Sequence, residues 1–279
     1  MTSYIPQPIP CYKAQEMQSF RRGNCQPYEC RYLVSGNNII MTNIMIRRPK
    51  SGAAVDVYLV DLNDNDAGLV TIPSITNHDL DTESEFEMLT LNAGNWGLVF
   101  SPSGGQYYFR IETDSTYFSE AFTLDFGSDG FPICSDDFAK ISWTDGRCIV
   151  AGKASDNTHD VLAYPDLSHT FFMYLRGNVA QPEWEVEEQG GDDANGVFVA
   201  DSRRLAKRWK FTGFPVNEST IDALQASALF ESVTIEFPTA TAFTGVSDIK
   251  VNPQWEQGGC FARYEYSFTS DYLLKRNCC

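Results

Sequence analysis

Alternating acidic side chains are the first group in this sequence whose spacing could support chemistry. Glu183, Glu185 and Glu187 alternate along a strand-like stretch, so their carboxylates would lie on one face. Two carboxylates about 5–9 Å apart can hydrolyse a glycosidic bond. A simpler interpretation is an exposed acidic face that meets a basic partner. The same chain supplies basic residues shortly afterwards, at Arg203, Arg204, Lys207 and Arg208. We therefore predict a hairpin of acidic and basic strands that forms a candidate subunit interface, and not a catalytic site.

Two aspartate-rich segments carry the oxygen ligands that calcium prefers. Residues 61–66 read DLNDND, which places oxygen ligands at positions 1, 3 and 5 of a calcium loop. The rest of that motif fails, because Asp66 stands where the loop needs glycine and Ile72 where it needs glutamate. A turn rich in Asn and Asp explains the segment more simply. Asp192 and Asp193 are likewise typical of a solvated loop.

The cysteines and histidines follow no metal-binding or catalytic pattern. Cys25 and Cys30 form one loose pair, and zinc requires a second pair that the sequence lacks. Reduced thiols are expected because no export signal is visible. His78, His159 and His169 lie in separate contexts, away from any nucleophile motif. We therefore expect no cofactor, no metal and no enzymatic activity.

The elements that must hold these residues are strands with one helix. Residues 207–237 predict a strand, a short helix and a second strand. Pro215 is expected to end the first strand, because proline has no N–H for the ladder. Asn217 or Ser219 then caps the helix. The predicted apolar helix face consists of Ile221, Leu224, Ala228 and Leu229.

The remaining chain is rich in short alternating runs, so the predicted fold class is mainly β with two β-sandwich-type domains. Residues 37–126 are assigned to an immunoglobulin-like sandwich that ends in a hairpin with its turn at 113–115. Residues 131–279 form the second β-rich domain, with the helix packed on its sheet. The Gly/Asp/Ser-rich joint at 125–130 marks the boundary. Residues 1–36 are interpreted as an arm or loop that docks either on a neighbouring subunit or on its own domain.

Composition restricts the partners of this protein. The chain has 279 residues, a net charge of −16 and a pI of about 4.5, which argues against nucleic acid because phosphate binding needs a basic surface. No stretch approaches the roughly 20 apolar residues of a membrane span, so no membrane insertion is expected. With no visible targeting signal, the protein is expected to be made and assembled in the cytoplasm.

Several segments from Tyr107 onward resemble a known group of proteins. They are YYFRIETDSTYFSEAF, CSDDFAKISWTDGRC, PEWEVEEQGGDDANGVF with SRRLAKRWKF, STIDALQASALFESVTIEF and QWEQGGCFARYEYSFTSDYLLKR. In order and character they are similar to uncharacterised virion tail proteins of tailed phages and prophages of Bacteroidota. The resemblance implies a structural component near the distal tail or baseplate, located in the virion tail and assembled in the host cytoplasm. It implies other tail proteins and further copies in a ring as partners, and it carries over no catalytic residue.

A carbohydrate- or receptor-binding β-sandwich module is the alternative function, with a host surface glycan as its ligand. Exposed aromatic side chains on a concave face would favour it, and core packing would disfavour it. The residues that decide between the two are Trp96, Tyr107, Tyr108 and Trp143. Core packing is the expected outcome, and an enzyme is the least favoured function.

Overall fold

The protein is built almost entirely from β-strands. The computed structural model describes residues 7–14, 31–50, 52–80, 83–99, 102–128, 131–132, 138–145, 149–151, 162–164, 169–230, 232–238, 242–256, 259 and 261–277. Strands make up 66% of the structure, and α2 (Glu218–Ser227) is the one helix among those residues. The mainly β prediction is confirmed.

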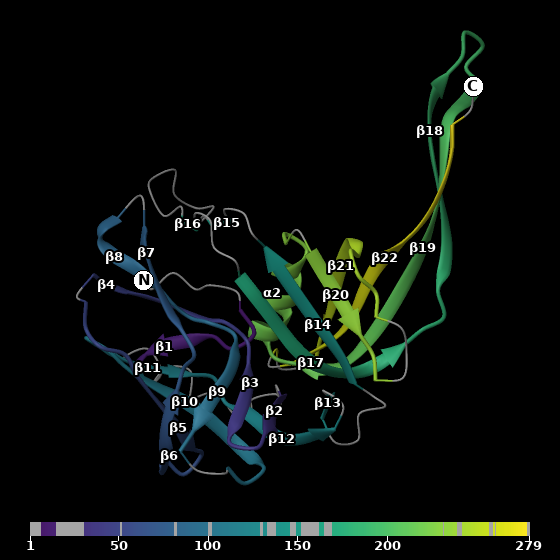
Figure 1. Ribbon diagram of the computed structural model, residues 1–279. Coiled ribbons are helices and arrows are strands. Elements are labelled where there is room, and N and C mark those ends of the chain that lie inside the picture. Colours follow the sequence, from purple (N-terminus) through teal and green to yellow (C-terminus); the bar gives the residue numbers. More distant parts are fainter. Residues whose placement is uncertain are drawn as a thin grey trace.

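Seven strands close into a barrel (Figure 1). In the order in which they pair around the ring, they are β2 (Arg31–Ser35), β3 (Asn38–Met41), β9 (Gly94–Leu98), β6 (Asp66–Thr71), β5 (Asp56–Asp61), β10 (Gly105–Glu112) and β12 (Phe122–Ser128). The β12–β2 pair is parallel and completes the ring, while the other neighbours are antiparallel. The two-sandwich prediction is therefore not confirmed, since the first set of strands forms a ring without edges.

Aromatic side chains fill the barrel interior. Trp96 and Phe109 are fully buried with ring centroids 5.2 Å apart, and Phe109 lies 4.7 Å from Phe122. Tyr32, from β2, packs edge-on against Phe122 at 5.7 Å. Because β2 supplies both a barrel strand and a core residue, residues 31–35 belong to the barrel and not to the predicted N-terminal arm.

The described part of the N-terminal segment packs on its own chain. Strand β1 (Cys11–Lys13) pairs with β11 (Thr116–Ser119), and Ile9 is buried. The Gln7 side chain completes a strand edge, because its amide accepts from Met45 N at 2.8 Å and donates to Met45 O at 3.0 Å. Residues 7–13 therefore dock on their own domain, which is one of the two predicted alternatives for the N-terminal segment.

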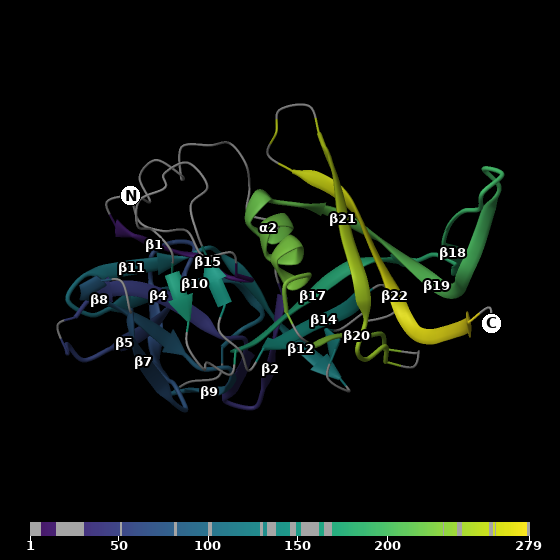
Figure 2. The same cartoon turned by 90° about the horizontal axis from the view of Figure 1, so that it is seen from above.

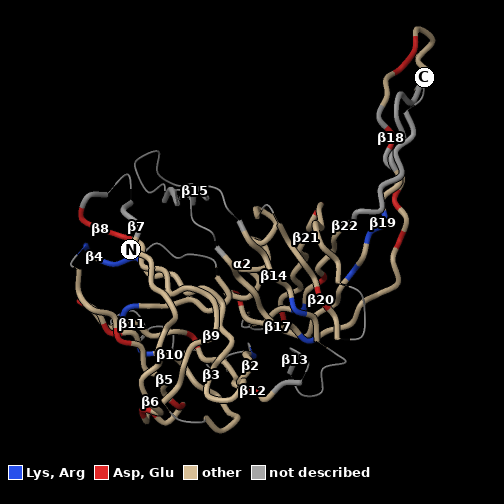
Figure 3. Tube along the Cα trace, viewed as in Figure 1, with Lys and Arg blue, Asp and Glu red and all other residues tan. Residues whose placement is uncertain are grey.

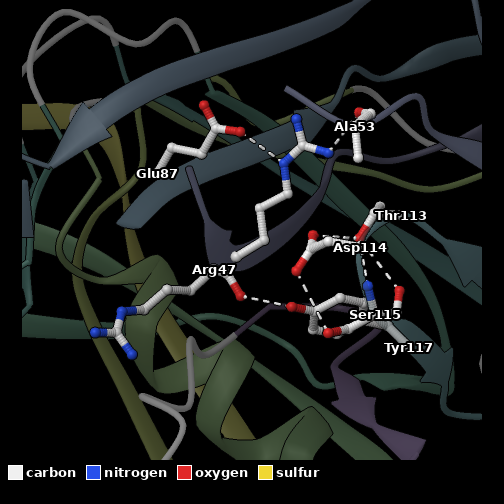
Figure 4. A network of polar contacts seen from close by, with 8 residues as sticks. Arg47, Ala53, Glu87, Thr113, Asp114, Ser115 and Tyr117 are labelled. Atoms are coloured by element: carbon white, nitrogen blue, oxygen red, sulfur yellow. Dashed lines mark hydrogen bonds and ion pairs between the residues drawn. The ribbon is translucent and has the colours of Figure 1, made fainter. Parts of the chain in front are cut away.

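A three-stranded sheet lies beside the barrel and contains a buried ion pair. Its strands are β4 (Ile44–Pro49), β8 (Glu83–Leu91) and β7 (Ile75–Leu80). Arg48 Nε donates to Glu87 Oε1 at 2.7 Å, and Arg48 Nη1 donates to Ala53 O at 3.0 Å. Figure 4 labels the two acceptors, Glu87 and Ala53, and marks both bonds with dashed lines. The hydroxyl of Tyr117 donates to Arg47 O at 3.1 Å, which ties β11 to this sheet. The predicted turn at 113–115 joins β10 to β11 and is confirmed.

The second half of the chain forms an open antiparallel sheet. Its strands, in spatial order, are β20 (Ser232–Glu236), β14 (Phe138–Asp145), β17 (His169–Val179), β19 (Phe198–Val216), β22 (Ala262–Asn277) and β21 (Ser247–Trp255). The shorter strands are β13 (Phe131–Pro132), β15 (Ile149–Ala151) and β16 (Leu162–Tyr164). A backbone pairing between Tyr174 and Arg31 joins this sheet to the barrel. Division into domains at 125–130 stays a prediction, and β12 runs into that segment.

Helix α2 packs on this sheet close to the barrel (Figure 2). Asn217, one of the two predicted candidates, caps the helix, with Oδ1 accepting from Thr220 N at 3.1 Å. Ile221 and Leu224 are buried, but the helix ends at Ser227 and Leu229 is 76% exposed, so the predicted apolar face is wrong at its C-terminal end. Ser227 occupies the face instead, with its hydroxyl 3.0 Å from that of Tyr266.

Strand β19 is longer than predicted, because it continues through Pro215 to Val216. Its register with β22 shifts between Gly213 and Val216, so Pro215 lies within an irregularity of the ladder. A proline is tolerated there because no ladder bond is required from its nitrogen. Gly213 packs so closely on the Tyr264 ring that an added Cβ would overlap it.

Candidate interaction surface: the projecting arm

Three strands extend away from the body of the protein as a ribbon (Figures 1 and 2). They are β18 (Glu183–Asp192), residues 198–210 of β19 and residues 269–277 of β22, which we call the arm. β19 lies in the middle and pairs antiparallel with both neighbours. The sequence predicted the hairpin of β18 and β19. It missed the arm because the third strand comes from the C-terminal segment, some seventy residues further along.

The predicted acidic and basic residues all lie in the arm. β18 carries Glu183, Glu185 and Glu187, and β19 carries the basic residues. Acidic and basic positions both appear where the arm leaves the body (Figure 3). Arg208 Nε donates to Glu185 Oε2 at 2.6 Å, and this hydrogen bond lowers the pKa of Glu185. Lys210 Nζ donates to Glu183 Oε1 at 3.1 Å, which raises the pKa of Lys210. These two acids therefore meet their basic partners within one chain.

Charged positions at the outer end of the arm face one another by backbone register. Glu187 stands opposite Arg204, and Glu188 stands opposite Arg203. Lys207 stands opposite Trp184, and its ammonium group lies 5.7 Å from the Trp184 ring centroid and 4.7 Å from that of Trp209. The structure thus brings the seven predicted residues together. Their role between subunits stays a prediction.

Apolar side chains on the arm remain exposed to solvent. Trp184 and Val186 are 58% and 59% exposed, and Val197 and Phe198 at the tip are 59% and 51% exposed. Trp184 and Val186 lie on the sheet face that continues from the buried core face of β19, where Phe211 is 1% exposed. The sheet face that is buried in the body therefore continues onto the arm, where no described element covers Trp184 and Val186. An exposed apolar patch on a projecting element is typical of a protein–protein contact.

The arm ends in a turn built by an aspartate. Asp193 Oδ1 accepts from Asn195 N at 2.8 Å and from Val197 N at 2.9 Å, and Gly196 adopts φ +75°. Hydrogen bonds from the backbone of Val197 and Asn195 lower the pKa of Asp193. The loop interpretation is confirmed for this residue, whose carboxylate holds the turn together.

The calcium-like segment is also a turn. Asp61 Oδ1 accepts from Asn63 N at 2.8 Å and from Asn65 N at 2.9 Å, while Asp61 Oδ2 accepts from Asn65 Nδ2 at 3.0 Å. Hydrogen bonding by Asn65 lowers the pKa of Asp61. Asp66 forms an ion pair with Arg110 at 2.6 Å. The carboxylates therefore serve the hairpin and its neighbours, as the turn interpretation predicts.

The four aromatic residues that could mark a glycan site are all buried. Trp96, Tyr107, Tyr108 and Trp143 are 0%, 7%, 5% and 1% exposed. The prediction of core packing is confirmed for each of them. Among the described residues, no helix is long and apolar enough to span a bilayer. His159 and the cysteine pair Cys25 and Cys30 lie outside the described residues.

A buried carboxylate that sequence reasoning missed joins three parts of the chain. Glu120 follows β11 and accepts from Tyr12 OH at 3.1 Å, from Asn217 Nδ2 at 2.9 Å and from Ser219 Oγ at 2.8 Å. Burial raises the pKa of Glu120. This cluster ties β1 and the barrel to the start of α2. No local sequence signal marks it, because its members are about a hundred residues apart.

Comparison with protein-family models, with curated proteins and with solved structures found no match for this chain in any of the three. The arm is the feature of the described structure that has the clearest character of a contact surface.

Proposed function

We propose that this protein is a non-enzymatic structural subunit of a phage tail, located near the distal tail or baseplate. It joins other tail proteins and further copies of itself through contacts made by the arm. The observation that carries the proposal is the arm itself, a three-stranded ribbon whose core-like face is left uncovered at Trp184 and Val186. We choose a phage tail as the particle because the segments from Tyr107 onward resemble virion tail proteins of tailed phages.

An isolated ribbon gains stability when its apolar face is covered. A sheet of few strands is marginal in water unless one face packs against another element. In the body, α2 and the neighbouring strands supply that cover, and Leu224 of the helix is fully buried. Burying Trp184 and Val186 against a neighbouring subunit would contribute roughly 25 cal/mol for each Å² of apolar surface removed from water.

Electron microscopy of the chain co-expressed with its neighbouring gene products tests the proposal. We expect the protein to co-purify with tail particles and to appear as added density. The Trp184→Ser/Val186→Ser variant should fold normally, since both side chains are more than half exposed, but should be lost from the particles. The matched control is Leu62→Ser/Val99→Ser, which changes residues 51% and 76% exposed on the barrel half.

Two outcomes would contradict this proposal in different ways. Normal incorporation of the Trp184→Ser/Val186→Ser chain would show that the arm face is not the contact. A wild-type chain that never associates with particles, yet binds glycans on an array, would refute the tail role and favour the receptor-binding alternative.

A further inference from the structure

The arm has two long backbone edges of different composition. On one side, β18 pairs with β19, and no other described strand pairs along its outer edge. On the other side, β21 pairs with β22 only through residues 262–269, so residues 270–277 have no strand beyond them among the described residues. Open edges of this length are templates for pairing with another chain. The arm contains no proline on either edge that would block such pairing.

Residues that stand opposite one another across the three strands of the arm form rows of charged positions. Each row has an acidic residue at one edge and two adjacent basic residues towards the other edge. One row runs from Glu188 through Arg203 to Arg276, and the next runs from Glu187 through Arg204 to Lys275. Each row therefore reads acidic, basic, basic from the β18 edge to the β22 edge. Like charges directly opposite in a sheet are destabilising, so the second basic residue of each row calls for an acidic neighbour on its outer side.

From these rows we infer that the β22 edge of one arm, at residues 270–277, pairs with the β18 edge of the arm of a second copy. The neighbouring copy then places Glu188 and Glu187 beside Arg276 and Lys275, and every row alternates in sign across the junction. This inference rests on the proposed function, because it names the edges through which the subunits assemble.

Strand direction fixes the geometry of this contact. β18 and β22 both run antiparallel to β19, so they are parallel to one another within an arm. Two arms that point the same way can therefore join by a parallel β22–β18 pair. Two different surfaces meet in such a contact, which makes it a head-to-tail interface that repeats from copy to copy and closes into a ring if the rotation permits. Pairing of β18 with a second β18 is disfavoured, since it would bring acidic residues together.

Charge reversal on the β22 edge tests this pairing. The Lys275→Glu/Arg276→Glu variant turns each row into acidic, basic, acidic, which removes the like-charge pairs within the chain. The monomeric arm should therefore be at least as stable as in the wild type, yet association should weaken about tenfold or more because acidic residues then meet at the junction.

A compensating variant isolates the edge contact. Adding Glu187→Lys/Glu188→Lys to the first variant makes each row basic, basic, acidic. It restores opposite charges at the junction and keeps one favourable and one unfavourable pair per row within the chain, as in the wild type. Association should return to near the wild-type level. The control is Lys13→Glu/Lys50→Glu, which makes the same change in net charge on the barrel half, away from the arm, and should leave association unchanged.

Sedimentation equilibrium of the full chains over a wide concentration range measures these effects. The inference is overturned if the wild type remains monomeric throughout, or if Lys275→Glu/Arg276→Glu associates as strongly as the wild type. It is also overturned if the compensating variant fails to recover. Incorporation into tail particles is scored separately, so a chain that enters particles without this edge dependence refutes the pairing and leaves the structural role intact.

Discussion

The buried ion pair between Arg48 and Glu87 allows a prediction of stability with a definite size. Their side chains are 1% and 7% exposed, and their atoms approach to 2.7 Å. Removing one partner of such a pair leaves a buried charge without compensation, at a cost of about 3–5 kcal/mol. Arg48→Met and Glu87→Leu should each lower the free energy of unfolding by that amount, a large part of the roughly 5–15 kcal/mol of a typical domain.

The double variant should behave differently from the sum of the singles. If the two residues contributed independently, Arg48→Met/Glu87→Leu would cost about 6–10 kcal/mol. Replacing both charges by apolar side chains of similar size is instead often neutral, so we expect a loss of no more than about 1–2 kcal/mol. Urea denaturation of all four chains, followed by circular dichroism, gives the coupling free energy directly.

The neighbouring residue Arg47 supplies the control for this cycle. Its guanidinium stacks on the Phe86 ring at 4.0 Å and its side chain is partly exposed. Arg47→Met should therefore cost only about 0.5–1 kcal/mol. A double variant as unstable as the two singles combined would refute the reasoning, and so would an Arg48→Met chain that loses less than Arg47→Met.

Three further predictions concern the body of the protein. Gly213→Ala should cost about 3 kcal/mol or more in a denaturation experiment, because the added Cβ would overlap the Tyr264 ring. Asn217→Ala should lower the melting temperature through a loss of about 0.5–2 kcal/mol, because the Thr220 N–H loses its acceptor. Glu120 has a raised pKa, so its favourable contribution is fully present below the ordinary glutamate pKa of 4.5 and is lost as pH rises through the higher folded value. Relative to Glu120→Gln, the wild type should therefore gain melting temperature as pH falls from 7 towards 4.5.

Matched changes at exposed positions serve as controls for the Gly213 and Asn217 variants. Thr212→Ala, next to the glycine, and Gln225→Ala, in the exposed part of α2, should each stay within about 0.5 kcal/mol of the wild type. Equal stability of the buried and exposed variants would contradict the close packing at Gly213 and the capping role of Asn217. A melting-temperature difference between wild type and Glu120→Gln that does not change with pH would contradict the raised pKa of Glu120.

The local elements could be predicted from the sequence because their signals lie within a few residues. Alternation within residues 207–237 predicted the strand after the helix, which is β20, and its residues Val233 and Ile235 are buried. The polar residues before an apolar helical pattern restricted the cap to Asn217 or Ser219, and the structure shows that Asn217 is the cap. The Asn/Asp-rich turn at 61–65 followed from the short side chains that accept from their own backbone. The acidic and basic stretches could be paired because a short turn joins β18 to β19.

The choice of strand partners, in contrast, was decided by the tertiary structure. Closure of the barrel depends on the parallel pairing of β2 with β12, which lie some ninety residues apart and carry no local mark of each other. The pairing of β22 with β19 also has no local mark in the sequence. This pairing adds a third strand to the predicted two-stranded hairpin and forms the arm. The Glu120 cluster likewise assembles from residues of three distant segments. Period and capping chemistry act over a few residues, so the sequence alone determined the type of the local elements and the part of the helix face at Ile221 and Leu224. Partner choice depends on the packing of the whole chain, so only the tertiary structure decided which edges close and which apolar face is left uncovered on the arm.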